Sequence, residues 1–262
     1  VEWGGGGLPI RSFPSSSEDI VSVAGGSYQA YLIDSASAVS GLWASVVPPL
    51  EYSNLTAVAA GSSHGLGITQ QRTVVAWGYG GYGQTSVPAG LSNATSIATG
   101  YYHSLASTEE GLVKAWGAGG TNYAYFSPHY RQSSVPPGLT NVVQVTAGDY
   151  HSVALLANGS VVAWGKYTEG ETNVPIGLSD VTAVAAGGNH TLALHGNGTV
   201  TSWGDNTYGQ TNVPVGLTNV LGIAAGRQHS AALKADGTVV SWGVDNAHQI
   251  SGGIGVSNIV AI

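Results

Sequence analysis

Short apolar stretches that alternate or contain β-branched residues recur along the chain, and they predict strands. The clearest unit spans residues 181–219, with strands predicted at 181–186, 190–194 and 199–203. The first strand mixes Val with Ala, as expected where strands crowd toward an axis. Asn197-Gly198 separates the second and third strands and suits the positive φ angles of a tight hairpin turn. Each unit therefore forms a small antiparallel sheet.

The tryptophans reveal that this unit repeats. All seven occupy the same local context, and six of them precede Gly: Trp3, Trp43, Trp77, Trp116, Trp164, Trp203 and Trp242. Neighbouring tryptophans are 40, 34, 39, 48, 39 and 39 residues apart. A sheet of this size cannot bury both faces alone, so consecutive sheets must stack, and a period near 40 favours a propeller over a parallel solenoid.

We therefore predict an all-β, seven-bladed propeller that forms a single domain over residues 1–262. Six repeats of about 39 residues are expected at 20–54, 55–93, 94–141, 142–180, 181–219 and 220–258. The closing blade is split between residues 1–19 and 259–262, which supply a third and a first strand. Its second strand is missing from the sequence, so we expect either a longer natural chain or a strand-donating partner.

A Gly-x-x-His-like turn follows the first strand of each repeat. We place its glycine at Gly25, Gly61, Gly100, Gly148, Gly187 and Gly226, and its histidine at His64, His103, His151, His190 and His229, with Gln29 in the first repeat. Zinc needs three or four ligands within ~2.2 Å of one point. Histidines on different blades do not converge in this way, so we predict structural histidines that bond backbone across the blade, and no metal site.

Composition excludes several functional classes. Only 8% of residues are charged and the net charge is −7, so no basic field attracts nucleic acid. Cys and Met are absent, which excludes thiol chemistry and fits an oxidising, extracellular compartment. No apolar run is long enough for membrane insertion. Secretion would also suit the five N-glycosylation sequons, although such sequons are frequent by chance in this composition: Asn54, Asn93, Asn158, Asn189 and Asn197.

Two carboxylate pairs deserve comparison with the acid–base pairs of glycosidases. Glu109 and Glu110 are adjacent, and Glu169 lies two residues before Glu171. Both pairs fall in predicted turns or connectors, where we expect solvated charges. The sequence therefore predicts no enzyme, no catalytic residue and no cofactor.

Aromatic residues outside the repeat pattern mark a candidate binding surface. The loop between the first two strands and the loop after the third strand must share one face of the propeller. That face carries the only large insertion, TNYAYFSPHYR at residues 121–131. Tyr, Phe and Arg with few carboxylates are typical of protein-binding hot spots. The predicted partner-binding residues are Tyr28, Tyr79, Tyr101, Tyr102, Tyr123, Tyr125, Phe126, Arg131, Tyr150 and Tyr167.

The repeat resembles that of the regulator of chromosome condensation family. Its Ala-Gly-x-x-His-Ser turn stands at residues 147–152 and 225–230, and its Gly-Gln at Gly83-Gln84 and Gly209-Gln210. The short repeats and recurring Val-Pro are most similar to bacterial secreted propeller-type β-lactamase inhibitory proteins, which cover an enzyme's active-site rim with aromatic loops. The resemblance implies a seven-bladed binding scaffold and leaves its partner open.

The first candidate function is a protein-binding module that could inhibit an enzyme. The sequence leaves two other functions open. A carbohydrate-binding propeller would place an aromatic residue at one equivalent position in every repeat. The position of Tyr28, Tyr102 and Tyr150 instead holds Ser63, Asn189 and Gln228 elsewhere, so only a lectin with one or two irregular sites near Tyr101 and Tyr125 fits. The other alternative is a structural subunit of an extracellular assembly.

Overall fold

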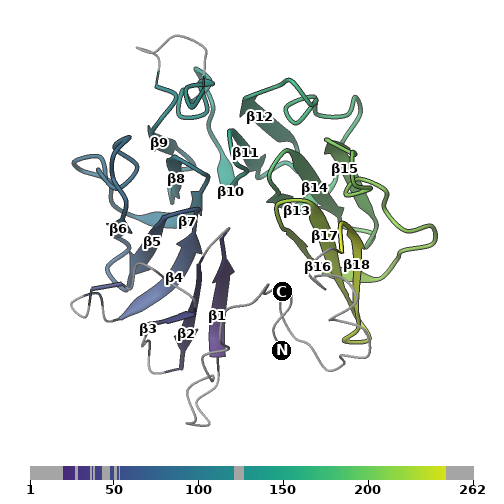
Figure 1. The fold of residues 1–262 in the computed structure, drawn as a ribbon, viewed down its shortest axis with the longest axis horizontal. Helices are drawn as coiled ribbons and strands as arrows, with labels where there is room; N and C mark the ends of the chain where they lie inside the picture. The colour runs from purple at the N-terminus through teal and green to yellow at the C-terminus, as the bar shows by residue number, and fades with distance from the viewer. Residues whose placement is uncertain are drawn as a thin grey trace.

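Six three-stranded antiparallel sheets make up the described part of the chain. The structure is a computed structural model that describes residues 20–26, 29–35, 37, 39–42, 48–49, 52, 54–120 and 127–245. Figure 1 shows the sheets following one another in chain order around a common centre. We number these sheets blades 1 to 6. The all-β propeller is thereby confirmed.

Each blade has an inner, a middle and an outer strand. The inner strands are β1 (Ile20–Gly25), β4 (Leu55–Ala60), β7 (Ala94–Thr99), β10 (Val142–Ala147), β13 (Val181–Ala186) and β16 (Val220–Ala225). The middle strands are β2 (Ala30–Asp34), β5 (His64–Thr69), β8 (His103–Thr108), β11 (His151–Leu156), β14 (His190–His195) and β17 (His229–Lys234). The outer strands are β3 (Val39–Leu42), β6 (Val74–Gly78), β9 (Val113–Gly117), β12 (Val161–Gly165), β15 (Val200–Gly204) and β18 (Val239–Gly243).

The strand predictions for residues 181–219 agree with blade 5. The first strand coincides with β13, whereas the second extends by one residue and the third is displaced by one. Gly198 takes a φ of 75° in the hairpin turn, as the Asn-Gly pair predicts. Every inner strand also has a register shift at its second residue, such as Thr56 in β4. These β-bulges strengthen the local twist of the strand.

The hydrophobic core lies between blades. Each core cluster combines side chains of two consecutive blades, and each contains a buried tryptophan from the later blade: Trp77, Trp116, Trp164, Trp203 and Trp242. Between blades 3 and 4, for example, Leu105 packs in one cluster with Val142, Val145 and Trp164. Burial of apolar area is the main stabilising term in folding. A blade therefore depends on its neighbours for its stability.

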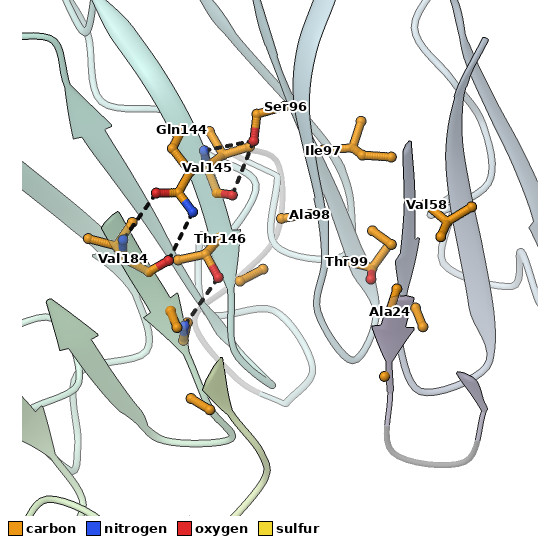
Figure 2. Close-up of a pocket in the computed structure, with 17 residues that line it drawn as sticks. Ala24, Val58, Ser96, Ile97, Ala98, Thr99, Gln144, Val145, Thr146 and Val184 are labelled. Atoms are coloured by element: carbon orange, nitrogen blue, oxygen red, sulfur yellow. Dashed lines mark hydrogen bonds between the residues drawn. The ribbon is translucent and has the colours of Figure 1, made fainter. Parts of the chain in front are cut away.

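The inner strands surround a central cavity of about 310 Å³ (Figure 2). Its lining is rich in alanine, which explains the Val-Ala composition of the first strand in each repeat. A few polar side chains join adjacent inner strands there. The Gln144 amide spans β10 and β13, because its Oε1 accepts from Val184 N at 3.0 Å and its Nε2 donates to Val184 O at 3.1 Å. Ser96 Oγ likewise accepts from Val145 N at 3.2 Å.

Two sequence predictions need comment. The number of seven blades stays a prediction, because the split blade falls on residues 1–19 and 259–262, outside the described residues.

The turn glycine of the first repeat is Gly26 and not Gly25, since Gly26 N donates to Gln29 O as Gly61 N donates to His64 O. Gly25 is instead the last residue of β1, so the predicted position of this turn glycine was wrong by one residue. Within the described ranges, no helix has the length and hydropathy to cross a membrane.

Candidate functional site

Both aromatic loop sets lie on the same face of the propeller. In blades 2 to 6, the first residue after the outer strand hydrogen-bonds to the turn between the inner and middle strands. For example, Ala118 N donates to Tyr102 O, and Lys166 N donates to Tyr150 O, each at 2.9 Å. Tyr79 N bonds Ser63 O in the same way, at 2.8 Å. The antiparallel order of the three strands requires this arrangement, because the first and third strands run in the same direction.

Six tyrosines on this face form a connected cluster, which we call the tyrosine surface: Tyr79, Tyr82, Tyr101, Tyr102, Tyr130 and Tyr150. Its centre is Tyr102, whose ring centroid lies 4.6 Å from those of both Tyr82 and Tyr101. Tyr150 lies 5.9 Å from Tyr101 and 5.3 Å from Tyr130. The cluster joins loops of blades 2, 3 and 4.

The cluster is half buried at its centre and open at its edge. Tyr101, Tyr102, Tyr130 and Tyr150 are partly buried, whereas Tyr79 and Tyr82 are exposed. Burial and, after it, the Asp149 carboxylate raise the pKa of Tyr150 to about 12. Burial also raises the pKa of Tyr102, and the neighbouring tyrosines raise it further. The phenols of Tyr102 and Tyr150 are therefore neutral at physiological pH and present hydroxyl groups as hydrogen-bond donors.

The predicted partner-binding residues fall into three groups. The structure brings Tyr79, Tyr101, Tyr102 and Tyr150 together in the tyrosine surface. Tyr167 and Arg131 are exposed on loops of the same face. The other predicted residues lie outside the described ranges: Tyr28, Tyr123, Tyr125 and Phe126.

The sequence prediction missed Tyr82, Tyr130 and His129. Tyr82 and His129 contact each other with centroids 6.1 Å apart, and Tyr130 packs against Tyr150. Tyr82 stands two residues before Gln84, and Tyr130 stands two residues before Gln132. This shared position in the repeat was the signal that could have identified both tyrosines.

A buried glutamine holds each of these loops in place. Gln84 Oε1 accepts from Tyr82 N at 2.9 Å, and Gln132 Oε1 accepts from Tyr130 N at 2.7 Å. The backbone carbonyl of the same glutamine bonds to the next blade, since Gln84 O accepts from Trp116 Nε1 and Ser104 Oγ, both at 2.8 Å. The glutamine at this position of the repeat therefore fixes the aromatic loop to the joint between two blades.

Backbone hydrogen bonds also connect the turns of blades 3 to 6 beside the tyrosines. Tyr101 N donates to Asp149 O at 3.1 Å, Asp149 N to Gly188 O at 3.0 Å, and Gly188 N to Arg227 O at 3.2 Å. Arg227 Nε also pairs with Asp149 Oδ2 at 3.3 Å. A Cβ on Gly188 would approach Arg227 O to 2.7 Å, so this close passage requires glycine. The turns thus hold one another in fixed positions.

The repeated histidines connect one blade to the next through side-chain hydroxyls. His64, His103, His151 and His190 are fully buried, and the Nε2 of each lies 2.9–3.0 Å from the hydroxyl of Ser104, Ser152, Thr191 and Ser230, respectively. The prediction of structural histidines agrees with these contacts. The hydroxyl partner on the next blade was not predicted, and for His64 and His103 the backbone of the next histidine in the series, His103 and His151, also takes part. Among the described residues, no cluster of three or more His, Asp or Glu is arranged to hold a metal ion.

The hydrogen bonds define the protonation state of these histidines. Ser104 Oγ donates its proton to Gln84 O, so it must accept from His64 Nε2–H. Burial lowers the pKa of His64 and His190 to about 4, and that of His103 and His151 to about 3. The four imidazoles are therefore neutral near pH 7. Ser152 and Ser230 donate in the same way to Gln132 O and Gln210 O, so His103 and His190 also carry their proton on Nε2.

The carboxylate pairs behave differently from one another. Glu109 is exposed as predicted and pairs with Arg72 at 2.7 Å. Glu171 is fully buried, so the prediction of a solvated charge was wrong for this residue. It occupies the glutamine position of the repeat, and its Oε2 accepts from Glu169 N at 2.7 Å. Glu171 follows Gly170 where other repeats have Gly-Gln, and the fold buries the residue at this position whether it is Gln or Glu.

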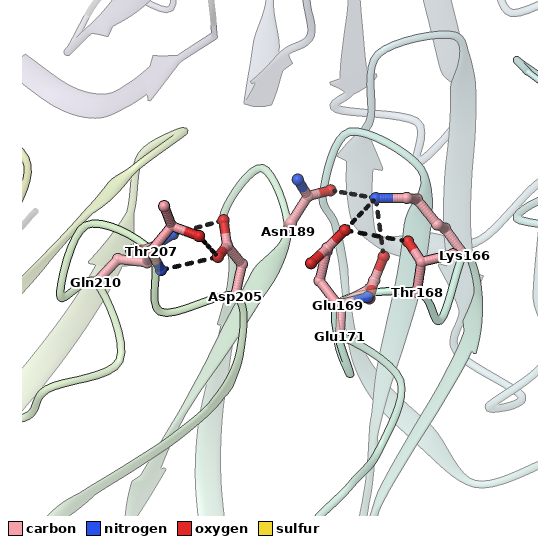
Figure 3. A network of polar contacts seen from close by, with 8 residues as sticks. All are labelled: Lys166, Thr168, Glu169, Glu171, Asn189, Asp205, Thr207 and Gln210. Carbon is pink, nitrogen blue, oxygen red and sulfur yellow. Dashed lines mark hydrogen bonds and ion pairs between the residues drawn. The ribbon is translucent and has the colours of Figure 1, made fainter.

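Lys166 neutralises the buried Glu171 carboxylate (Figure 3). Its Nζ lies 3.5 Å from Glu171 Oε1, 3.9 Å from Glu169 Oε1 and 3.3 Å from Asn189 Oδ1. The Lys166 ammonium group is surrounded by these three acceptor oxygens, so the network is a structural ion pair. It lies on the same face as the tyrosine surface and forms part of the fixed frame around it.

The sequons differ in their surroundings. Asn158 and Asn197 are exposed at hairpin turns, where their Oδ1 atoms accept from Ser160 N and Thr199 N. Asn54 and Asn93 are exposed before inner strands, with φ angles of 68° and 54°. Asn189 is half buried, and its Oδ1 accepts from Lys166. Its amide is the least accessible of the five to a modifying enzyme.

Comparisons with solved structures place the fold among known propellers. Yeast RCC1 (Prp20) bound to Kap60 is 22% identical with a TM-score of 0.70, and the match covers 87% of this chain and 70% of that one. Prp20p of Saccharomyces cerevisiae is 20% identical with a TM-score of 0.71, over 92% and 75% of the two chains. The ectodomain of the Physcomitrella patens receptor kinase CR4 is 22% identical with a TM-score of 0.68, over 86% and 64%.

The repeats themselves match a family model. The regulator of chromosome condensation (RCC1) repeat matches residues 55–84, 94–122, 142–171, 181–210 and 220–249, which together are more than half of the chain. A comparison with curated proteins found no match. The matched stretches contain the inner, middle and outer strands of blades 2 to 6, with their buried tryptophans and joint histidines. On these repeats and this fold, the chain belongs to the RCC1 repeat family of β-propellers.

Proposed function

We propose that this propeller is a secreted, non-enzymatic scaffold that binds a protein partner through the tyrosine surface. The observation that carries the proposal is the contact of six tyrosine rings from three consecutive blades on one face. Tyrosine offers a large contact area at a low cost in side-chain entropy, and it is enriched in binding hot spots. The partner would be an extracellular protein, and inhibition of an enzyme is one consequence of such binding.

The orientation of the rings favours a protein over a sugar. Tyr79 and Tyr82, the most exposed members, are inclined to one another by 69°, and Tyr82 and Tyr102 by 51°. A flat platform for stacking sugar rings needs coplanar aromatic faces, whereas inclined rings suit the irregular relief of a protein. Tyr101 and Tyr150, inclined by 15°, are the pair that best suits an irregular sugar site.

The frame around the surface supports the same function. Buried Gln84 and Gln132 hold the aromatic loops, and the linked turns of blades 3 to 6 fix their spacing. A preorganised surface loses little conformational entropy on binding. Among the structural relatives, yeast Prp20 is described with Kap60, Gsp1p and histones, which are proteins. We further propose a seventh blade, split between residues 1–19 and 259–262, that closes the ring.

Tyr82 and Tyr208 provide a matched pair for testing the surface. They stand at equivalent positions, two residues before Gln84 and Gln210, and their exposed fractions are 39% and 48%. Tyr82 contacts three aromatic rings, whereas no ring contact is seen for Tyr208 within the described ranges. Tyr82→Ala should therefore reduce partner binding at least tenfold, and Tyr208→Ala should leave it within about twofold.

The experiment is quantitative capture of extracellular proteins from the source by wild type, Tyr82→Ala and Tyr208→Ala, followed by affinity measurement with the captured protein. A partner that is lost with Tyr82→Ala and retained with Tyr208→Ala supports the proposal. Equal loss or equal retention overturns it. Binding to a glycan array that depends on Tyr101 would establish the carbohydrate alternative instead.

A further inference from the structure

Two rings of the tyrosine surface come from different blades and lie in close contact. Tyr82 belongs to the loop after β6 in blade 2, and Tyr102 belongs to the turn between β7 and β8 in blade 3. Their ring centroids are 4.6 Å apart, with the planes inclined by 51°. Tyr79, the other exposed ring beside Tyr82, is 6.3 Å away. Contacting aromatic pairs have centroids about 4.5–7 Å apart, so Tyr82 and Tyr102 lie near the short end of this range.

The backbone holds both rings in this contact. Gln84 Oε1 accepts from Tyr82 N, and Tyr102 O accepts from Ala118 N, each at 2.9 Å. The two loops also pack against Gly117, where a Cβ would lie 2.6 Å from Tyr102 O and 3.1 Å from Gln84 Cα. The contact between the two rings is therefore a fixed feature of the joint between blades 2 and 3.

The tyrosine surface is also the place where an external oxidant meets readily oxidised side chains. Cys and Met, whose sulfur atoms oxidants commonly attack, are absent from the sequence. The tryptophans of blades 2 to 6 are only 4–7% exposed. Tyr82 is 39% exposed, so its phenol can pass an electron to an oxidant and a proton to water. Oxidation of the described chain is therefore expected at exposed tyrosines such as Tyr82.

We propose that Tyr82 and Tyr102 form an oxidative cross-linking site, at which hydrogen peroxide and a haem peroxidase join the two rings as dityrosine. Each phenol loses one electron and one proton, and the two phenoxyl radicals couple through ring carbons ortho to their oxygens. The hydrogen on each of these carbons then moves to the oxygen, which restores two aromatic phenols. The two electrons and two protons reduce one hydrogen peroxide to two water molecules.

The cross-link would connect blades 2 and 3 covalently. A chain without cysteine has no disulfide with which to do this. A covalent bond between residues 82 and 102 closes a loop of the chain and so restricts the unfolded state, as a disulfide does. The site rests on the contact of the two rings and does not depend on the partner proposed for the tyrosine surface.

The experiment treats the full-length chain with a haem peroxidase and limiting hydrogen peroxide at micromolar protein concentration. We expect dityrosine fluorescence in the monomer, an intact mass lower by two hydrogen atoms, and a cross-linked pair of peptides that contain Tyr82 and Tyr102. Because the rings are held in contact, coupling within one molecule should be faster than coupling between molecules. The monomer yield should therefore stay the same on tenfold dilution of the protein. The cross-linked chain should unfold at a higher urea concentration.

A matched pair of variants identifies the site. Tyr82→Phe keeps a ring in the contact but removes the phenol, so it should reduce dityrosine in the monomer at least about tenfold, because any other pair lacks this fixed contact. Tyr208→Phe changes a tyrosine at the equivalent position that is 48% exposed and has no ring contact within the described ranges. It should leave the yield within about twofold of wild type. Both changes delete only an exposed hydroxyl, so both variants should fold.

Several outcomes would overturn the proposal. One is the absence of dityrosine from the treated monomer, and another is formation mainly between molecules, seen as covalent dimers whose yield falls on dilution. Equal yields from wild type and Tyr82→Phe would also reject it, as would peptides that link a different pair of tyrosines. Partner binding does not enter the measurement, so failure of the proposed function would leave the expected cross-link unchanged.

Discussion

The joints between blades 4 and 5 and between blades 5 and 6 have the same hydrogen-bond arrangement. The residues that face the buried side chain, Lys166 and Asp205, carry opposite charges. In the first, Glu171 Oε2 accepts from Glu169 N, and Glu171 Oε1 faces Lys166 Nζ at 3.5 Å. In the second, Gln210 Oε1 accepts from Tyr208 N at 2.9 Å, and Gln210 Nε2 donates to Asp205 Oδ2 at 3.0 Å. Lys166 and Asp205 stand at the same position, immediately after Trp-Gly.

The comparison shows which property the fold requires. Both joints need one buried oxygen to accept the loop N–H and one backbone carbonyl to accept from the tryptophan of the next blade, as Glu171 O and Gln210 O do. The other polar atom of the buried side chain differs between the joints. It is an amide nitrogen in Gln210, which faces Asp205, and a carboxylate oxygen in Glu171, which faces Lys166. The repeat therefore constrains hydrogen-bond geometry, and charge is matched locally.

The first prediction breaks the ion pair of the joint between blades 4 and 5. Lys166→Met should reduce the free energy of unfolding by about 3–5 kcal/mol, because it leaves a buried carboxylate without a cation. The matched change Asp205→Asn keeps an acceptor for Gln210 Nε2 and should cost at most about 1 kcal/mol. Urea denaturation of both variants measures the difference, and equal losses would contradict the comparison.

The second prediction concerns acid stability at the two joints. Burial lowers the folded-state pKa of His151 to about 3 and that of His190 to about 4; the Lys166 charge lowers the former further, and the Asp205 charge raises the latter. Both values lie below the unfolded value of about 6.5, so the unfolded chain binds more protons and stability falls as the pH decreases below it. Each histidine should contribute a loss of up to about 1.4 kcal/mol per pH unit.

Single glutamine variants test this assignment. His151→Gln and His190→Gln should each flatten the dependence of unfolding free energy on pH by about one proton between pH 6 and pH 4. His190 has a folded-state pKa of about 4 and His151 one of about 3. Below pH 4, therefore, only the His151 variant should still differ from wild type in the slope of unfolding free energy against pH. An unchanged slope in either variant would show that its histidine is not buried in the neutral form.

The third prediction exchanges the chemistry of the joints. Lys166→Asp combined with Glu171→Gln gives the first joint the residues of the second. The double variant should recover at least about 2 kcal/mol relative to Lys166→Asp alone, which places two carboxylates together. A double-mutant cycle in urea measures this coupling energy. Purely additive losses would mean that the two positions do not act as a pair.

The fourth prediction compares the hydroxyls that meet the histidines. Ser230→Ala removes the partner of His190 and one of the two donors to Gln210 O, and it should cost about 2 kcal/mol. Thr191→Val preserves the side-chain shape and removes the partner of His151, so it should cost about 1 kcal/mol. Thermal unfolding measures this difference in stability. A larger loss for Thr191→Val than for Ser230→Ala would contradict the role of the serine hydroxyl in bonding both His190 and Gln210 O.

Much of the fold could be predicted because each repeat encodes it locally. Alternating residues, the Asn-Gly turn and the Trp spacing indicated antiparallel sheets that stack radially, and blade 5 follows the predicted strands within one residue. The candidate surface was predicted only in part. Tyr79, Tyr101, Tyr102 and Tyr150 were identified as unusual residues, but Tyr82 and Tyr130 were missed because ring contacts between blades depend on how the loops are held.

The sequence by itself determined the repeat, the strand order within a blade and the face that carries the aromatic loops, because these depend on residues close together in the chain. Only the tertiary structure decided that His64 meets Ser104 and that Glu171 is buried against Lys166. The first contact joins residues 40 positions apart on different blades. The second joins residues of one loop, but their burial depends on the next blade, which packs over them. A local pattern specifies a blade, whereas desolvation and hydrogen-bond partners at a joint are properties of two blades packed together.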